Sequence, residues 1–370
     1  MSISVAPQSA SGERMRARVM IVDDSAVIRG LVARWLAEVG EFEVVTTASN
    51  GRLALEALER YNPDIVLLDL EMPEMDGVDA LPLLLKRRPG VKIVVVSTLT
   101  QRNAQISLKC LSLGAADYLA KPDGQRQVAA VEAFRRELIE KLKALAPKRG
   151  RTAPEAAPAA ASPARVQRRP APVRPACLLI GASTGGPRAV ERVLVGLGSA
   201  IRHVPVLVVQ HMPAMFTSVF ADHLRMQTGV QAREPSDGEP VRPGTVFVAP
   251  GGRHMGLSAG KSGPVIRLDD TAPVNFCRPA VDVLFRDAAS IYGAAALAVI
   301  LTGMGSDGTQ GSRLLVDAGG TVLAQDEGTS IVWGMPGSVV KAGLAQDILP
   351  LEAIGPALSN FITGAPYERA

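Results

Sequence analysis

The stretch DIVLLDLEMPEMDG, Asp64–Gly77, decides the fold class of the first part of the chain. It begins with a short apolar run that ends in Asp69 and is followed by a turn containing proline and glycine. A short apolar run bounded by turn residues is typical of a strand buried on both faces, as in a parallel sheet. Two similar runs flank it in the chain, RVMIVDD at residues 18–24 and VKIVVVS at residues 91–97.

Segments with a helical pattern lie around these strands, at residues 25–39, 51–61 and 77–87. Strands that alternate with helices predict a parallel sheet with helices on both faces. The same alternation returns beyond residue 176. Its expected strands are CLLIGAS (177–183), VPVLVVQH (204–211), TVFVAP (245–250), ALAVILTG (296–303) and TVLAQD (321–326), and its expected helices are 187–197, 215–227, 281–292 and 309–318. We therefore expect an α/β protein with two doubly wound parallel-sheet domains.

An Ala- and Pro-rich segment separates the two patterns and contains the runs PAAASPA and RRPAPVRP. Repeated proline disfavours helix and favours an extended, semi-stiff spacer. We expect a disordered N-terminus at residues 1–17, a first domain at 18–142, a linker at 143–175 and a second domain at 176–370.

The charge of the chain excludes some classes of protein. The formal net charge is +4, but residues 141–175 alone carry nine Lys or Arg and one acid, which leaves the rest of the chain at −4. A solvated linker is therefore a better interpretation of this segment than a nucleic-acid-binding arm. The three cysteines form no CxxC pair, so neither a disulfide framework nor a zinc site is expected. With no signal peptide and no run of about 18 apolar residues, we expect a cytoplasmic protein that is not embedded in a membrane.

Polar residues end the expected strands of the first domain. They are Asp23, Asp24, Asp69, Ser97 and Thr98, together with Lys121, which follows a further short strand expected at residues 117–120. In an open parallel sheet, ligands bind beyond the carboxyl ends of the strands. Carboxylates that converge there repel one another and favour a hard cation such as Mg²⁺. Beside Mg²⁺ and a lysine, a carboxylate can accept a phosphoryl group, because both cations neutralise the transferred charge.

With these residues in place, the segment from Arg18 to Leu142 resembles the receiver domains of two-component signalling, which have a flavodoxin-like fold. The motifs that carry the resemblance are VDDS, LLDLEMPEMDG, VVVST and ADYLAKP. The resemblance implies that Asp69 is phosphorylated and that Pro122 follows a cis bond. It also implies that Asp23, Asp24, Asp69 and the carbonyl of Glu71 hold Mg²⁺, that Ser97 is the switch hydroxyl, that Lys121 contacts the phosphate and that Tyr118 is the rotating aromatic residue.

The second domain opens with a strand that runs into Gly181-Ala182-Ser183-Thr184-Gly185, a G-x-S-x-G pattern. This pattern places a serine on a tight turn between a strand and a helix, with its hydroxyl exposed. The alternative is a glycine loop that binds phosphate. It is weaker, because neither G-x-G-x-x-G nor Gly-Lys-Ser/Thr is present.

Two further residues follow apolar strands of this domain. His211 follows VPVLVV, and Asp307 lies in LTGMGSDG after ALAVI. Alone, His211 could be structural, and Asp307 could be a turn former or a helix cap. Together with Ser183 they would meet at one edge of the sheet, and a nucleophile, a base and an orienting carboxylate are what acyl transfer needs. The chain order Ser, His, Asp differs from that of the α/β-hydrolases.

The combination resembles the chemotaxis response regulator protein-glutamate methylesterases, the CheB family. The motifs that carry the resemblance are IGASTGGP, VVQHMP, VAPGGRHM, RPAVDVLF, LTGMGSDG and WGMPG. The resemblance implies a Rossmann-like second domain that hydrolyses glutamate γ-methyl esters on chemoreceptors and deamidates glutamines. The enzyme would act at the periphery of receptor arrays, would receive its phosphoryl group from the histidine kinase of the chemotaxis system, and would need no cofactor for ester hydrolysis.

The resemblance also bears on the surroundings of the three catalytic candidates. The oxyanion would be stabilised by N–H groups near Thr184, Gly185 and Met304. His254 is a possible neighbour of the site, and His223 is expected at the surface. Cys277 stands where many relatives carry histidine, and we expect it to have a packing role.

Two rival functions remain to be compared. A DNA-binding response regulator would need a basic helix-turn-helix output, whereas this second domain is longer and has an α/β pattern. A nucleotide-binding scaffold would need a phosphate-loop signature. We further expect the unphosphorylated receiver to cover the catalytic edge, and phosphorylation to favour an open state.

Overall fold

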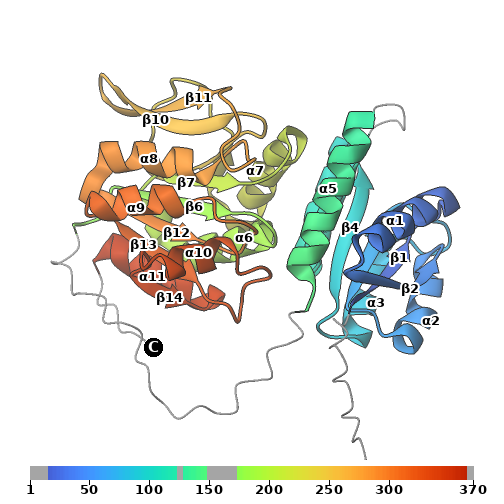
Figure 1. Cartoon of the computed structure of the whole chain (residues 1–370). Coiled ribbons are helices and arrows are strands. Elements are labelled where there is room, and N and C mark those ends of the chain that lie inside the picture. Colours follow the sequence, from blue (N-terminus) through green and yellow to red (C-terminus); the bar gives the residue numbers. More distant parts are fainter. Residues whose placement is uncertain (1–15, 123–127, 148–172, 365–370) are drawn as a thin grey trace, which may run out of the picture.

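The structure, a computed structural model, describes residues 16–122, 128–147 and 173–364. The expected disordered N-terminus and most of the expected linker lie outside these residues. Within them, two parallel sheets are each covered by helices (Figure 1). No helix in this part of the chain is long and apolar enough to cross a membrane.

The first sheet has five parallel strands in the order β2-β1-β3-β4-β5, which is the flavodoxin-like order. The strands are β1 (Ala17–Val22), β2 (Phe42–Ala48), β3 (Ile65–Asp69), β4 (Lys92–Thr98) and β5 (Asp117–Lys121). Strand β2 was not singled out from the sequence. It is an edge strand that is only partly buried, so its residues mix polar and apolar side chains.

Five helices flank this sheet: α1 (Ala26–Val39), α2 (Gly51–Tyr61), α3 (Gly77–Arg87), α4 (Gln101–Leu113) and α5 (Val128–Leu145). Helices α1 and α5 pack with Val19 and Ile21 on one face, whereas α2, α3 and α4 pack with Met20 and Val22 on the other. Helix α5 extends three residues beyond residue 142, where the domain was expected to end. The cis bond expected before Pro122 is wrong, because the cis peptide bond in the described residues is Arg278–Pro279.

The second sheet has seven parallel strands in the order β14-β13-β12-β6-β7-β9-β8. They are β6 (Cys177–Ala182), β7 (Val206–Gln210), β8 (Gln231–Arg233), β9 (Thr245–Val248), β12 (Ala296–Ile300), β13 (Thr321–Gln325) and β14 (Asp347–Leu349). A separate antiparallel hairpin is formed by β10 (His254–Gly260) and β11 (Gly263–Asp269). Strands β6, β7 and β12 form the centre of the sheet, and they carry the three catalytic candidates at their carboxyl ends.

Helices cover both faces of this sheet. They are α6 (Gly186–Leu197), α7 (Ala214–Thr228), α8 (Val281–Tyr292), α9 (Thr309–Asp317), α10 (Met335–Lys341) and α11 (Leu351–Thr363), with short 3-10 turns at Gly198–His203 and Gly293–Ala295. Helices α6, α7 and α11 pack with Leu178 and Ile180, whereas α8, α9 and α10 pack with Cys177 and Leu179. The two doubly wound domains expected from the sequence are therefore present.

The two domains touch along α6 and α7, which face the first domain in Figure 1. Helix α4 packs against both of them, and the hydroxyl of Ser112 donates to Glu191 at 3.1 Å. His223 lies 2.9 Å from the same carboxylate, and its side chain is only 13% exposed. His223, which was expected at the surface, is therefore partly covered by the interdomain contact, with Ser112 of the first domain 3.3 Å from its ring.

Candidate active site and switch site

Ser183 lies on a sharp turn between β6 and α6. Its N–H donates to the carbonyl of Thr302 at 3.1 Å, and its own carbonyl accepts the N–H of Gly186 at 2.7 Å. Gly185 has φ +75°, which a residue with a side chain rarely adopts, and a Cβ there would lie 2.7 Å from Ile331. A Cβ on Gly303 would lie 2.8 Å from the Cβ of Ser183. Glycines therefore allow the turn to form and the loop after β12 to approach the serine.

The backbone around this turn leaves several donors free. Among the described residues, the N–H groups of Thr184, Gly185 and Met304 donate no hydrogen bond to a protein acceptor, whereas that of Gly186 is used within the turn. Free N–H groups beside a nucleophile can stabilise a developing oxyanion. Thr184, Gly185 and Met304 are the residues near which the resemblance places the oxyanion donors, and that role stays a prediction.

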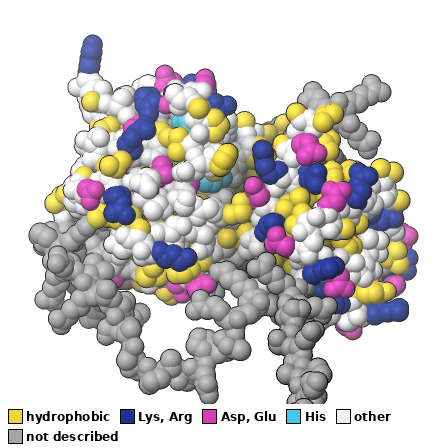
Figure 2. Space-filling model, in the orientation of Figure 1, with side chains coloured by type: hydrophobic (Ala, Val, Ile, Leu, Met, Phe, Trp, Pro, Cys, Tyr) yellow, Lys and Arg dark blue, Asp and Glu magenta, His cyan; other side chains and the backbone are white. Residues whose placement is uncertain are grey.

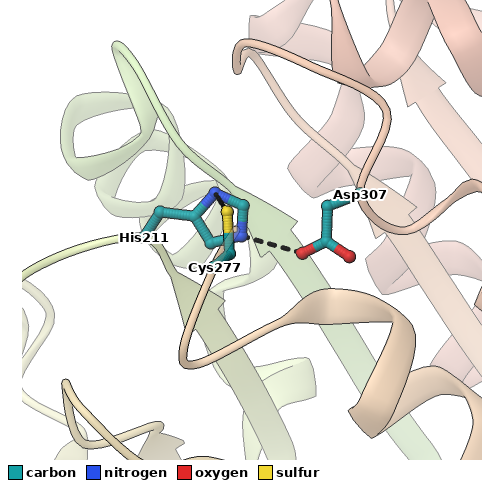
Figure 3. Close-up of side chains that lie close together, drawn as sticks. All are labelled: His211, Cys277 and Asp307. Carbon is teal, nitrogen blue, oxygen red and sulfur yellow. Dashed lines mark hydrogen bonds and ion pairs between the residues drawn. The ribbon is translucent and has the colours of Figure 1, made fainter. Parts of the chain in front are cut away.

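His211 follows β7, and its position is tied to the serine turn. Its N–H donates to the carbonyl of Ala182 at 3.1 Å, and Nε2 of Gln210 donates to the carbonyl of Ser183 at 2.9 Å. Nε2 of His211 lies 2.8 Å from a carboxylate oxygen of Asp307 (Figure 3). Within the described residues, Ser183 Oγ makes no hydrogen bond with His211. The structure thus joins the histidine to the aspartate and places the serine directly after the adjacent strand β6.

Asp307 is held by the N-terminus of α8. Its carboxylate accepts the N–H groups of Val281 at 2.6 Å and Asp282 at 3.1 Å, and helix α8 has no side-chain cap of its own. Burial opposes ionisation of this group, but the hydrogen bonds with His211 and with these N–H groups hold the pKa of Asp307 below its usual value. Asp307 is therefore an anion that both caps a helix and orients the imidazole.

Asp282, in the first turn of α8, in turn accepts a hydrogen bond from the first turn of α9. Its carboxylate accepts the N–H of Gly311 in α9 at 2.7 Å, and Asn275 donates to it at 2.9 Å. Asn275 also donates to Asp307 at 3.2 Å. Burial, together with the nearby charge of Asp307, raises the pKa of Asp282. The motif sequence signalled Asp307 but gave no reason to select Asp282 or Asn275.

Cys277 lies on the other side of the imidazole. Its Sγ is 3.5 Å from Nδ1 of His211, so each ring nitrogen faces one neighbour (Figure 3). The thiol is partly exposed, which differs from the packing role expected for it. Burial of the ring lowers the pKa of His211, but the contacts with Asp307 and Cys277 outweigh it and raise that pKa to about 10. The sequence contained one sign that position 277 lies beside His211: Cys277 stands where many relatives carry histidine.

His254 has a structural place outside this chain of contacts. Its ring is fully buried and lies 3.1 Å from the carbonyl of Ala272, and the N–H of Ala280 donates to it at 3.2 Å. It therefore supports the loop that carries Cys277 and touches none of the three catalytic candidates directly.

The carboxyl edge of the first sheet gathers the expected acidic residues. Ligand oxygens of Asp23, Asp24 and Asp69 lie within 4.8 Å of one another. Lys121 Nζ is 2.9 Å from Asp23 and 2.8 Å from Asp69. Burial raises the pKa of Asp69 to about 6, although Lys121 opposes the shift. Carboxylates crowded in this way fit a divalent cation, which would relieve their repulsion.

The two expected switch residues are both buried. The hydroxyl of Ser97 lies 3.0 Å from that of Ser107. The ring of Tyr118 stacks on Phe216 of α7, while Lys141 lies over the tyrosine ring and donates to its carbonyl. Tyr118 thus belongs to the interface between the domains.

Comparison with known proteins agrees with both halves of this architecture. The family model "CheB methylesterase" matches residues 178–358, and "Response regulator receiver domain" matches residues 19–132. A protein-glutamate methylesterase/protein-glutamine glutaminase of Nitrobacter hamburgensis is 47% identical over 366 residues, which cover 96% of each chain. A protein of the same name from Bradyrhizobium diazoefficiens, of a group 2 operon, is 46% identical and covers 98% of this chain and 99% of its own. The crystal structure of the Thermotoga maritima CheB methylesterase catalytic domain is 41% identical, with a TM-score of 0.49, and covers 51% of this chain and 99% of its own.

Proposed function

This chain belongs to the CheB methylesterase family of two-domain response regulators, and we propose that its second domain hydrolyses glutamate γ-methyl esters on chemoreceptors by serine chemistry. The enzyme is a protein-glutamate methylesterase and protein-glutamine glutaminase, controlled by its receiver domain. The observation that carries the serine mechanism is the 2.8 Å pair of His211 and Asp307 beside the Ser183 turn.

The reaction begins when Ser183 Oγ gives its proton to His211 and attacks the ester carbonyl. Asp307 holds Nε2, so Nδ1 is the nitrogen that receives the proton. The free N–H groups of Thr184, Gly185 and Met304 stabilise the tetrahedral oxyanion. Methanol leaves with the proton from His211, and water then hydrolyses the acyl-enzyme by the same base. On a glutamine side chain, ammonia would be the leaving group.

The receiver is phosphorylated on Asp69 in this proposal. Mg²⁺ would be held by Asp23, Asp24, Asp69 and the carbonyl of Glu71, and it would neutralise charge on the transferred phosphoryl group. Lys121, already 2.8 Å from Asp69, would contact the phosphate, and Ser97 would hydrogen-bond to it. The phosphodonor would be the histidine kinase of the same system.

Regulation follows from where the receiver touches the second domain. Val332 is buried within an apolar cluster of receiver side chains, and Ile331 and Met304 pack against the same cluster. Ile331 also lies where a side chain on Gly185 would be. The unphosphorylated receiver therefore packs against loops that border the nucleophile turn. Loss of these contacts after phosphorylation would expose the site to a receptor helix.

The chain is proposed to work in the cytoplasm, at receptor arrays and without binding nucleic acid. On the face drawn in Figure 2, basic and acidic side chains of the described residues are interspersed over both domains. A mixed surface of this kind gives little electrostatic attraction for a nucleic-acid backbone.

Methanol release from a methylated receptor fragment tests the proposal. We expect release by the intact enzyme, an increase with acetyl phosphate and Mg²⁺, and loss in Ser183→Ala. A Ser218→Ala variant, changed at an exposed position of α7, is the matched control and should retain activity. Full residual activity in Ser183→Ala would reject the serine mechanism, and release that ignores acetyl phosphate would reject the proposed control by the receiver.

A further inference from the structure

The thiol of Cys277 is a nucleophilic group at the active site that ester hydrolysis does not use. Its Sγ lies 3.5 Å from Nδ1 of His211, and the residue is partly exposed, whereas Cys110 and Cys177 are buried. Figure 3 shows the thiol reaching the imidazole ring from the loop that precedes α8. Access from solvent and a neighbouring base are thus combined at one cysteine of the three.

The loop holds this thiol in place. The backbones of Val274 and Cys277 exchange hydrogen bonds of 2.8 and 3.1 Å, and the two residues between them have positive φ angles of 51° and 63°. One of these is Asn275, whose side chain donates to Asp282 and Asp307. The network that orients His211 therefore also positions Cys277.

An imidazole beside a thiol favours proton transfer from sulfur to nitrogen. The resulting thiolate is the reactive form of cysteine, and the imidazolium stabilises it. Asp307 faces the other ring nitrogen at 2.8 Å and stabilises the positive charge on the ring. The same two side chains that support a base for Ser183, His211 and Asp307, thus also stand beside the sulfur of Cys277.

We propose that Cys277 is a peroxide-reactive thiol and that its oxidation switches the esterase off. The inference rests on the proposed role of His211 as the base. The Cys277 thiol gives its proton to Nδ1 of His211 as its sulfur attacks one oxygen of hydrogen peroxide, so that an S–O bond forms as the O–O bond breaks. The departing hydroxide takes the proton from Nδ1 of His211 and leaves as water. Sulfur loses two electrons, the peroxide gains them, and the product is a sulfenic acid.

The consequence for catalysis follows from competition for one nitrogen. Because Asp307 occupies Nε2, both Ser183 and Cys277 depend on Nδ1 of His211. A sulfenic acid at Cys277 can donate its hydroxyl proton to Nδ1 in a hydrogen bond. The base is then unavailable to the serine until a reductant restores the thiol.

The test treats the full chain with hydrogen peroxide and traps sulfenic acids with dimedone. Mass spectrometry should find the adduct on Cys277, and methanol release should fall at least tenfold and return after dithiothreitol is added. After peroxide treatment, Cys277→Ala should release methanol at the same rate as the untreated Cys277→Ala variant. The matched control Cys110→Ala should lose activity as the unmodified sequence does. Equal inactivation of Cys277→Ala would overturn the proposal.

A second arm is independent of ester hydrolysis. The rate of alkylation of Cys277 by iodoacetamide at pH 6.5 should fall at least about tenfold in His211→Gln, because the sulfur loses the neighbouring base that takes its proton. It should persist in Ser183→Ala. An unchanged rate in His211→Gln would overturn the proposed activation of Cys277 by His211. A reactive Cys277 in a chain that releases no methanol would instead reject the proposed function alone.

Discussion

The ring of Tyr118 stacks on the ring of Phe216, with centroids 4.3 Å apart and planes inclined by 18°. Tyr118 belongs to β5 at the end of the receiver sheet, and Phe216 lies in the first turn of α7. Helix α7 begins three residues after His211. One packed contact therefore connects the proposed phosphorylation switch with the element that follows the catalytic histidine.

Phe216→Leu should raise the activity of the unphosphorylated enzyme. An aromatic pair contributes about 0.5–1.5 kcal/mol beyond its buried area, so its loss should favour domain opening by roughly 2–12-fold. Methanol release without acetyl phosphate measures the effect. Phe220→Leu is the control, because Phe220 is equally buried in α7 but, among the described residues, makes no ring contact with the receiver. A similar rise in both variants would contradict a specific role for the stack.

Asp307→Asn should lower kcat by about 10³–10⁴, since an amide no longer holds the imidazole in the correct tautomer. It should also lower Tm by a few degrees, because Asp307 caps α8, and such a cap contributes about 1 kcal/mol. Asp282→Asn is the matched control. The Asp282 carboxylate accepts the N–H of Gly311 but does not touch His211. We expect it to lose stability with at most about a tenfold loss of activity. Comparable loss of kcat in both would deny Asp307 its proposed role.

Cys277→Ala should extend activity to lower pH. The contact with the thiol is among those that raise the pKa of His211, so its removal lowers that pKa, and the neutral base then exists at lower pH. The acid limb of kcat/KM between pH 5.5 and 9.5 should shift downward, whereas Cys110→Ala should keep the original limb. An unmoved limb in Cys277→Ala would show that the thiol does not influence the base.

The stability of the second domain should decrease at alkaline pH. The pKa of His211 is raised in the folded state from 6.5 to about 10, so its contribution is complete below pH 6.5 and is lost as pH rises through about 10. Chemical unfolding of the full chain and of His211→Gln at several pH values measures this. The difference between the two should shrink from pH 6.5 to 10. A constant difference would contradict the raised pKa.

Asp69→Asn should abolish phosphorylation by acetyl phosphate and leave basal ester hydrolysis intact. The reason is that Asp69 is the proposed acceptor, and its ion pair at 2.8 Å is with Lys121 of the same domain. Intact-mass measurement before and after treatment with acetyl phosphate and Mg²⁺ provides the readout. Asp79→Asn, in the exposed first turn of α3, should still gain one phosphoryl group. Phosphorylation of Asp69→Asn at the normal level would place the acceptor elsewhere.

Much of the fold could be predicted from local patterns. Buried central strands such as β3 and β6 are continuous apolar runs, and the polar residues at their ends announce both sites. Elements outside the centre of each sheet were harder to predict. The three-residue strands β8 and β14 are too short and too exposed to show a period, and the β10–β11 hairpin was not anticipated.

The sequence by itself determined the two parallel sheets and the strand ends where the chemistry gathers, because period and burial are properties of neighbouring residues. Only the tertiary structure decided which groups share His211. Cys277 is 66 residues away from it along the chain, and Asp307 is 96 residues away. The stack of Tyr118 on Phe216 likewise joins two domains across the segment between them. Such pairings depend on how whole elements pack, and no local pattern encodes which side chains will meet when separate helices and loops come together.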